Sequence, residues 1–177
     1  MAGRGCFSEH GFLANRFMIS MIDIYQYDLT VSAESIDVLG HVNNREYLRW
    51  MEKAAIEHAA ALGWDARAYL TRGETWVARE HWIEYLRPTY EGEKLTVLTW
   101  VANIQGSHSL RRYAIKRDKR LVCVGATEWV YIDYATGRPK PVPAEVAAAF
   151  TVIADDDPRL LADGLIRLVR FIPHHLG

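Results

Sequence analysis

The stretch from Asp37 to Asn44 gathers side chains that could carry out acid–base or nucleophilic chemistry. Asp37 supplies a carboxylate and His41 an imidazole, and Gly40 between them permits the backbone of a tight turn. Asn43 or Asn44 can cap a helix that begins here, by accepting a hydrogen bond from a free backbone N–H. Helix N-termini present unpaired N–H groups that stabilise negative charge. A reaction in which a carbonyl oxygen becomes an oxyanion could use this arrangement directly.

The flanking residues predict a strand before this stretch and a long helix after it. From residue 22 to residue 31, apolar and polar side chains alternate, which is typical of a strand with one buried face. From residue 44 to residue 62 the apolar period becomes helical, and Gly63 is placed to end the helix. Because this helix is apolar over much of its circumference, we expect a sheet to enclose it. His58, on the apolar stripe, is expected to be a satisfied core residue.

Four further strands are predicted at 75–87, 94–104, 109–117 and 121–134. The turns between them are short, so consecutive strands should pair antiparallel. Pro143 then opens a short helix at 144–150. A later helix could begin at Asp157-Pro158, with Leu161, Leu165 and Leu168 facing one way, but Gly164 and the β-favouring residues 168–172 argue against a single clean helix. The predicted class is therefore α+β, with an antiparallel sheet of about five strands around one long helix.

Composition narrows the class of protein. The chain has 177 residues and half of them are apolar, which suits one domain with a sizeable core. A net charge of −1 gives no support for nucleic-acid binding. Two distant cysteines suit a reducing compartment, and no run is long and apolar enough for a membrane span, so we expect a cytoplasmic protein without a membrane partner. We expect residues 1–21 to be a poorly ordered leader, 22–150 the domain, and 151–177 a C-terminal extension.

This order of elements resembles the hotdog fold, and the motifs resemble those of one hotdog family. The first motif is similar to that of the 4-hydroxybenzoyl-CoA thioesterases and their acyl-CoA thioester hydrolase relatives: Asp37-x-x-Gly40-x-Val42-x-x-x-x-Tyr47-x-Arg49-Trp50. Later residues fit in register: Tyr85-x-x-Pro88, Gly92, Asp133-x-x-Thr136-Gly-Arg-Pro139 and Pro143. The resemblance covers about residues 22–150 and implies hydrolysis of an acyl-CoA thioester to free acid and CoA.

The resemblance also implies roles for individual residues. Asp37 takes the place of the catalytic carboxylate, as nucleophile or general base, and the backbone N–H near Asn44 that of the oxyanion donor. His41 has two open interpretations, catalytic or structural. The plant acyl-ACP thioesterases, which this stretch also resembles, share the work among an Asp, an Asn and a His, but here Leu39 occupies the Asn position.

Substrate-binding roles are implied less directly. Gly40 precedes the helix as in the family. Asn43 is either a cap or a substrate ligand, and Tyr47 is either core or close to the acyl group.

A further set of residues follows the glycine turn at 105–108. Ser107, Ser109 and Arg111 lie where the family often holds the nucleotide, and CoA phosphates favour Arg, Lys and loop N–H groups. The alternative is a solvated strand face. The histidines and cysteines show no metal-ligand spacing, so we expect no metal and no cofactor beyond the CoA of the substrate. Trp76, Trp82 and Trp100 are candidates for an aromatic pocket.

Three other functions remain open at this point. One is acyl-ACP thioesterase. A second is a hotdog hydratase or dehydratase, whose Asp and His have D-x4-H spacing, whereas Asp37 and His41 here are one residue closer. A third is an acyl-CoA-binding protein without turnover. Because exposed sheet edges in hotdog proteins commonly pair, we expect a homodimer or homotetramer.

Overall fold

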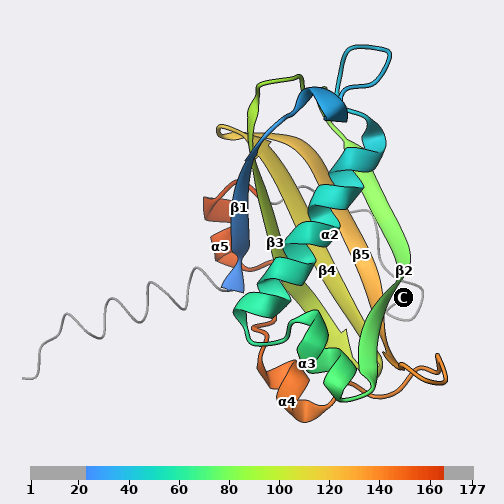
Figure 1. Ribbon diagram of the computed structural model, residues 1–177. Helices are drawn as coiled ribbons and strands as arrows, with labels where there is room; N and C mark the ends of the chain where they lie inside the picture. Colours follow the sequence, from blue (N-terminus) through green and yellow to red (C-terminus); the bar gives the residue numbers. More distant parts are fainter. Residues whose placement is uncertain (1–22, 166–177) are drawn as a thin grey trace, which may run out of the picture.

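A five-stranded antiparallel sheet forms the body of the molecule in the computed structural model, which describes residues 23–165 (Figure 1). The strands lie in the order β1-β3-β4-β5-β2. Their bounds are β1 Tyr25–Thr30, β2 Glu74–Tyr85, β3 Lys94–Gln105, β4 His108–Arg117 and β5 Arg120–Asp133. The helices are η1 Ala33–Ser35, α2 Asn44–Ala61, α3 Ala66–Thr71, α4 Ala144–Ala148 and α5 Pro158–Ala162.

Helix α2 lies across one face of the sheet (Figure 1). Its apolar stripe packs on the inner side chains of β3, β4 and β5, and the buried members include Tyr47, Trp50, Met51, Ala54 and Ala55. The contact is closest at Gly125, where an added Cβ would lie 2.8 Å from Met51 Sδ. A side chain at this position would force the Met51 side chain to shift and would crowd the Trp82 carbonyl oxygen at 3.0 Å. The helix ends at Ala61, and Gly63, which follows the C-cap Leu62, has a φ of +85° that favours glycine.

Residues 151–165 cover part of the opposite face. The Ile153 N–H donates to the Val101 carbonyl at 2.8 Å, which fixes this segment to β3. Its apolar side chains then pack against the outer side chains of β3 and β4, in a cluster that contains Leu98, Trp100, Ala114, Ile153, Leu160 and Leu165. The sheet is therefore buried on both faces at this end, and its middle strands carry long runs of buried residues.

The predicted class and topology are confirmed, and strand and helix bounds differ by a few residues at most. Asp157 caps α5 as expected, with Oδ1 accepting from the Arg159 N–H at 2.9 Å. The predicted apolar stripe of this helix is wrong, because α5 buries Leu160 and leaves Leu161 exposed. Residues 1–21 and Leu168 lie outside the described residues. Helix α3 was not predicted, although Asp65 caps it by accepting from the Ala68 N–H at 2.8 Å.

Candidate functional site

A tight turn between η1 and α2 carries Asp37. A β-bridge joins Ile36 to Val42, and inside it the Asp37 N–H donates to the His41 carbonyl at 2.9 Å. The Gly40 N–H closes the turn on the Asp37 carbonyl at 3.0 Å, with a φ of +82° at Gly40. This left-handed conformation is why a glycine stands there.

The Asp37 carboxylate has two different environments for its two oxygens. Oδ1 accepts a hydrogen bond from the Leu39 N–H at 2.8 Å, which makes Asp37 a turn-stabilising residue. Oδ2 lies 3.5 Å from His41 Nδ1, and the two side chains are 22% and 36% exposed. The sequence-predicted pair is therefore brought together in a partly exposed position at the surface. Val38, next to it, is fully exposed.

The N-terminus of α2 follows this turn directly. Asn43 is its cap: Oδ1 accepts from the Arg45 N–H at 3.1 Å and the carbonyl from the Glu46 N–H at 2.9 Å. In the part of the chain that the structure describes, the Asn44 N–H makes no hydrogen bond. One backbone donor at the positive end of an 18-residue helix thus remains available for an oxyanion.

Tyr47 lies below this end of the helix, in the core. Its hydroxyl is 2.6 Å from Thr89 Oγ1, and its ring meets Tyr85 edge to face at 5.3 Å. The Tyr85 hydroxyl donates to the Asn44 carbonyl at 3.1 Å. These contacts make Tyr47 a support that joins the helix start to the segment after β2, and its role near an acyl group stays a prediction.

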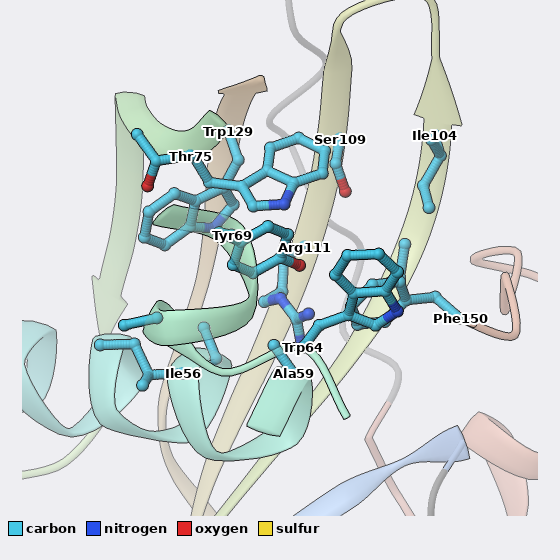
Figure 2. Close-up of a pocket in the computed structure, with 14 residues that line it drawn as sticks. Ile56, Ala59, Trp64, Tyr69, Thr75, Ile104, Ser109, Arg111, Trp129 and Phe150 are labelled. Carbon is cyan, nitrogen blue, oxygen red and sulfur yellow. The ribbon is translucent and has the colours of Figure 1, made fainter. Parts of the chain in front are cut away.

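A cavity of about 270 Å³ lies at the other end of α2, between that helix, α3 and the sheet (Figure 2). Ala55, Ile56 and Ala59 of α2 form one wall. Most of the remaining lining is aromatic, from Trp64, Tyr69, Trp76, Trp129 and Phe150. Trp76 is thus a pocket residue, as the sequence suggested, whereas Trp100 packs on the opposite face of the sheet. The α2 residues that line the cavity begin eleven positions after Asn44, which is about 16 Å along the helix.

Arg111 of β4 projects into this region with a residue exposure of 6%. Figure 2 shows its guanidinium among Tyr69, Trp64 and Phe150. Nη1 donates to His58 Nδ1 at 2.8 Å and to Thr99 Oγ1 at 3.4 Å. Because an arginine only donates, His58 accepts through Nδ1 and carries its proton on Nε2. Burial lowers the pKa of Arg111, and the nearby Tyr113 and Tyr69 oppose that shift.

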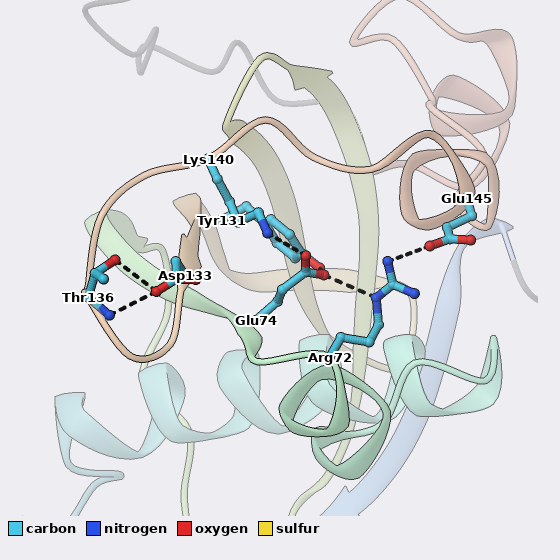
Figure 3. Close-up of polar contacts among 7 residues, drawn as sticks. All are labelled: Arg72, Glu74, Tyr131, Asp133, Thr136, Lys140 and Glu145. Carbon is cyan, nitrogen blue, oxygen red and sulfur yellow. Dashed lines mark hydrogen bonds and ion pairs between the residues drawn. The ribbon is translucent and has the colours of Figure 1, made fainter.

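A buried carboxylate holds the corner beside the cavity (Figure 3). Glu74, at the start of β2, accepts hydrogen bonds from Tyr131 and Lys140 at 2.6 Å and from Arg72 at 3.1 Å. Burial alone would raise the pKa of Glu74, but these three donors outweigh it and lower the pKa to about 2. Tyr131, held in this way, packs edge to face on Trp76 at 4.8 Å. The network therefore positions one aromatic wall of the cavity.

The sequence-predicted binding residues after the glycine turn are divided between two places. Ser107 lies in the β3–β4 turn, with Oγ 3.2 Å from His108 Nδ1. Ser109 and Arg111 are buried and line the cavity, so the alternative of a solvated strand face is wrong for both. Their proposed contact with a nucleotide stays a prediction, and the structure does not bring them together with the Asp37 turn.

Sequence reasoning missed Tyr69 as a pocket residue and gave Phe150 no role there. The available signal was Asp65 before an Ala-rich, helix-favouring run, which marks the α3 helix that carries Tyr69. Within residues 23–165, no group of three His, Cys, Asp or Glu side chains is placed to hold a metal ion. Across the same residues, no helix has the length and apolar character needed to span a membrane.

Comparison with known protein families decides the identity of the fold and the chemistry associated with it. The family model that describes the thioesterase-like superfamily matches residues 31–150, which is more than half of the chain. The chain belongs to the thioesterase-like superfamily. No curated protein sequence matches this thioesterase-family chain.

Solved structures agree with the family match. A 1,4-dihydroxy-2-naphthoyl-CoA thioesterase from Synechocystis is 17% identical with a TM-score of 0.66, over 71% of this chain and 94% of that one. A DHNA-CoA thioesterase from Staphylococcus aureus is 21% identical with a TM-score of 0.67, over 81% and 97%. An acyl-ACP thioesterase from Bacteroides thetaiotaomicron is 21% identical with a TM-score of 0.67, over 75% and 55%. At these identities the likeness establishes the shared hotdog fold, and with it the predicted resemblance is confirmed.

Proposed function

We propose that this thioesterase hydrolyses acyl-CoA thioesters, with Asp37 as the catalytic carboxylate. One observation carries the proposal. The Asp37 carboxylate is held by the Leu39 N–H in a turn that leads directly into a helix whose first N–H, at Asn44, makes no hydrogen bond within the described residues. A carboxylate and an oxyanion donor are the two groups that thioester hydrolysis needs.

The reaction can be written with Asp37 as a general base. Asp37 Oδ2 takes a proton from a water molecule as the water oxygen adds to the thioester carbonyl carbon. The carbonyl oxygen becomes an oxyanion and accepts the Asn44 N–H. The C–S bond then breaks, the oxyanion returns to a carbonyl, and the leaving thiolate takes up the proton that Asp37 holds, which restores the carboxylate. The products are a carboxylic acid and CoA thiol.

A second route uses Asp37 as a nucleophile. Oδ2 would add to the carbonyl carbon, expel the thiolate and form a mixed anhydride, which water then hydrolyses. In both routes His41 faces Oδ2 from 3.5 Å and can orient the carboxylate. We treat His41 as a positioning residue, because the imidazole contacts the carboxylate on which both routes depend.

The substrate class and the assembly are part of the same proposal. Two of the solved relatives are named for CoA thioesters and one for an acyl carrier protein thioester, which supports CoA as the first substrate to test. We also propose a homodimer or homotetramer, because β2 is an edge strand of twelve residues with exposed backbone groups. A monomer mass by light scattering at assay concentration would contradict this part.

The test is release of free thiol from a panel of aliphatic and aromatic acyl-CoAs. Asp37→Asn should lower kcat by about 10²–10⁴-fold, because it removes the base but keeps an oxygen that can accept from the Leu39 N–H. Asp133→Asn is the matched control. Asp133 Oδ1 accepts a backbone N–H, that of Thr136, at 2.8 Å in a turn at the opposite end of the sheet, so its loss should leave kcat unchanged.

Other outcomes would change the proposal in defined ways. Thiol release that survives in Asp37→Asn would remove Asp37 from the chemistry and keep thioester hydrolysis. Thiol release from acyl-ACP and not from acyl-CoA would identify acyl carrier protein, in place of CoA, as the carrier of the acyl group in the substrate. Hydration of an enoyl-CoA without thiol release would indicate a hydratase. Binding of acyl-CoA without turnover would indicate a non-catalytic acyl-CoA-binding protein.

A further inference from the structure

Arg111 is a buried cation, and no carboxylate among the described residues balances its positive charge. Its side chain is bonded to a neutral imidazole and a hydroxyl, through Nη1. Within residues 23–165 no carboxylate forms an ion pair with it, and its Nε and Nη2 make no hydrogen bond there. A charge buried in this way is costly unless it is paired, so such groups are found where a ligand supplies the partner.

Tyr69 adds a second donor to the same cavity. The Tyr69 residue is 6% exposed, and its hydroxyl makes no hydrogen bond of normal geometry within the described part of the chain. The Trp76 indole N–H approaches the hydroxyl, but an indole N–H only donates. The O–H proton of Tyr69 therefore has no acceptor, which is unusual for a buried polar group.

The other residues that line the cavity indicate the size and apolar character of the ligand it could hold. Aromatic side chains surround the cavity, and the Arg111 guanidinium lies 5.8 Å from the centre of the Phe150 ring. The volume of about 270 Å³ is just below the range of about 300–1,000 Å³ for pockets that hold drug-sized molecules. It suits one aromatic ring or a short aliphatic chain. Ile56, which lines the cavity from α2, is exposed and places the opening on the helix side.

We propose that this cavity binds a small organic carboxylate with an aromatic or short aliphatic body, and that Arg111 and Tyr69 donate to its carboxylate oxygens. The fork of a guanidinium matches the two oxygens of a carboxylate. Inorganic phosphate fits less well, because the surrounding walls are apolar and offer no further charge. The site is distinct from the Asp37 turn of the same chain, since about 16 Å of α2 separates them.

The carboxylate could come from two sources. It could be a free acid, or it could be a second carboxylate on the acyl group of a thioester that is held at the Asp37 turn of a second copy of the chain in the proposed oligomer, because about 16 Å of α2 separates the two places within one chain. The first source does not depend on the proposed hydrolysis. The second rests on it, so binding and turnover are measured separately.

The binding experiment is calorimetric titration of the full-length protein with benzoate and phenylacetate, and with the neutral benzamide and phenylacetamide. We expect the acids to bind at least about tenfold more tightly than the amides, because only the acids form a charge-assisted pair with Arg111. Inorganic phosphate should not bind at this site. Equal affinity for acid and amide, or no binding of any acid at millimolar concentration, would overturn the proposal.

Variants assign the effect to the two donors. Arg111→Met, which keeps an unbranched side chain but removes the charge and the N–H donors, should weaken benzoate binding by at least about tenfold and leave benzamide unchanged. Tyr69→Phe removes one oxygen and should weaken benzoate about threefold. Arg117→Met is the control, because Arg117 lies on the same strand but pairs with Glu93 at 2.7 Å, away from the cavity. Unchanged benzoate affinity in Tyr69→Phe and Arg111→Met would contradict the site, and Tyr69→Phe with the acid–amide comparison decides it even if Arg111→Met does not fold.

The source is distinguished by kinetics with glutaryl-CoA, which carries a second carboxylate, and butyryl-CoA, which does not. If the acyl group supplies the carboxylate, Arg111→Met raises KM for glutaryl-CoA alone. If a free acid supplies it, both KM values stay unchanged while benzoate binding is lost. If the protein binds benzoate but releases no thiol from any substrate, the proposed hydrolysis is contradicted and the proposed carboxylate site is not.

Discussion

Arg111 and Arg112 are neighbours on β4, yet the protein treats their charges in opposite ways. Adjacent residues of a strand point to opposite faces, so Arg111 lies under α2 and Arg112 under residues 151–165. Both are almost completely buried. Arg112 forms a bidentate pair with Asp155, with Nη2 at 2.6 Å and Nε at 3.1 Å from the two carboxylate oxygens. Arg111 contacts a neutral imidazole and a hydroxyl.

The difference between the partners of Arg112 and Arg111 distinguishes a charge that stabilises the fold from one that we propose binds a ligand. Arg112 and Glu74 each have an oppositely charged partner from a segment distant in sequence, Asp155 and Lys140 respectively, so these pairs join parts of the fold. Arg111 forms no such ion pair within the described residues, and its side chain lines a cavity instead. Paired buried charges should therefore be costly to disturb in the ligand-free protein, and Arg111 should not be.

The largest effect is expected at Glu74. Its folded pKa of about 2 lies below the usual value of about 4.3, so its contribution to stability is complete above that value and is lost as pH falls toward 2. Glu74→Gln should lower the free energy of unfolding by roughly 3 kcal/mol at pH 7. Denaturant unfolding at pH 7, 4 and 2.5 should show this difference shrinking as the wild-type carboxyl takes up a proton. A difference that is constant across these pH values would contradict the paired-charge interpretation.

A smaller effect is expected at Asp155. Asp155→Ala removes the carboxylate that Arg112 holds and should lower the free energy of unfolding by about 2 kcal/mol, less than for a fully buried pair because Asp155 is half exposed. Urea unfolding followed by circular dichroism measures it. Asp156→Ala, one residue along the same segment, serves as the control and should change stability little. An equal effect of both substitutions would show that the segment, not the pair, is what matters.

The smallest effect is expected at Arg111 itself. In the ligand-free protein, Arg111→Met should change the free energy of unfolding by less than about 1 kcal/mol in either direction. Removal of an unbalanced buried charge is favourable, and loss of the bonds to His58 and Thr99 opposes it. The same urea titration applies. A loss as large as that of Glu74→Gln would erase the contrast between the two arginines and make Arg111 a structural residue.

The sequence was sufficient for the fold and for the Asp37 turn because both depend on local patterns. The apolar period of α2, the glycine at position 40 and the Asn43 cap are properties of neighbouring residues, and each was found where predicted. His58 is buried and bonded to Arg111, as expected of a satisfied core residue. The motif resemblance then supplied the family, which the family match confirms.

The cavity could not be predicted in the same way, because it is formed by segments distant in sequence. Trp76 was suggested as a pocket residue, but Tyr69, Arg111 and Phe150 come from α3, β4 and the segment after α4, and no pattern in one of these segments reveals the others. The sequence suggested that Arg111 lies either at a phosphate site or on a solvated strand face. Successive side chains of a strand point to opposite faces of the sheet. Because both faces are covered here, Arg111 is buried on one face and Arg112 on the other.

The strand order also determines the order in which parts of the fold can form during synthesis. Strand β2 is made before β3, β4 and β5, yet its partner is β5, with Tyr85 opposite Cys123. At a synthesis rate of about 5–20 residues per second, β2 waits about 2–8 s on the ribosome for that partner. The turn around Asp37 needs the Ile36–Val42 bridge and then Thr89, and all of these residues are made before β5. We therefore expect a nascent chain to form the turn with the carboxylate first, and to close the aromatic cavity only after Phe150 has emerged.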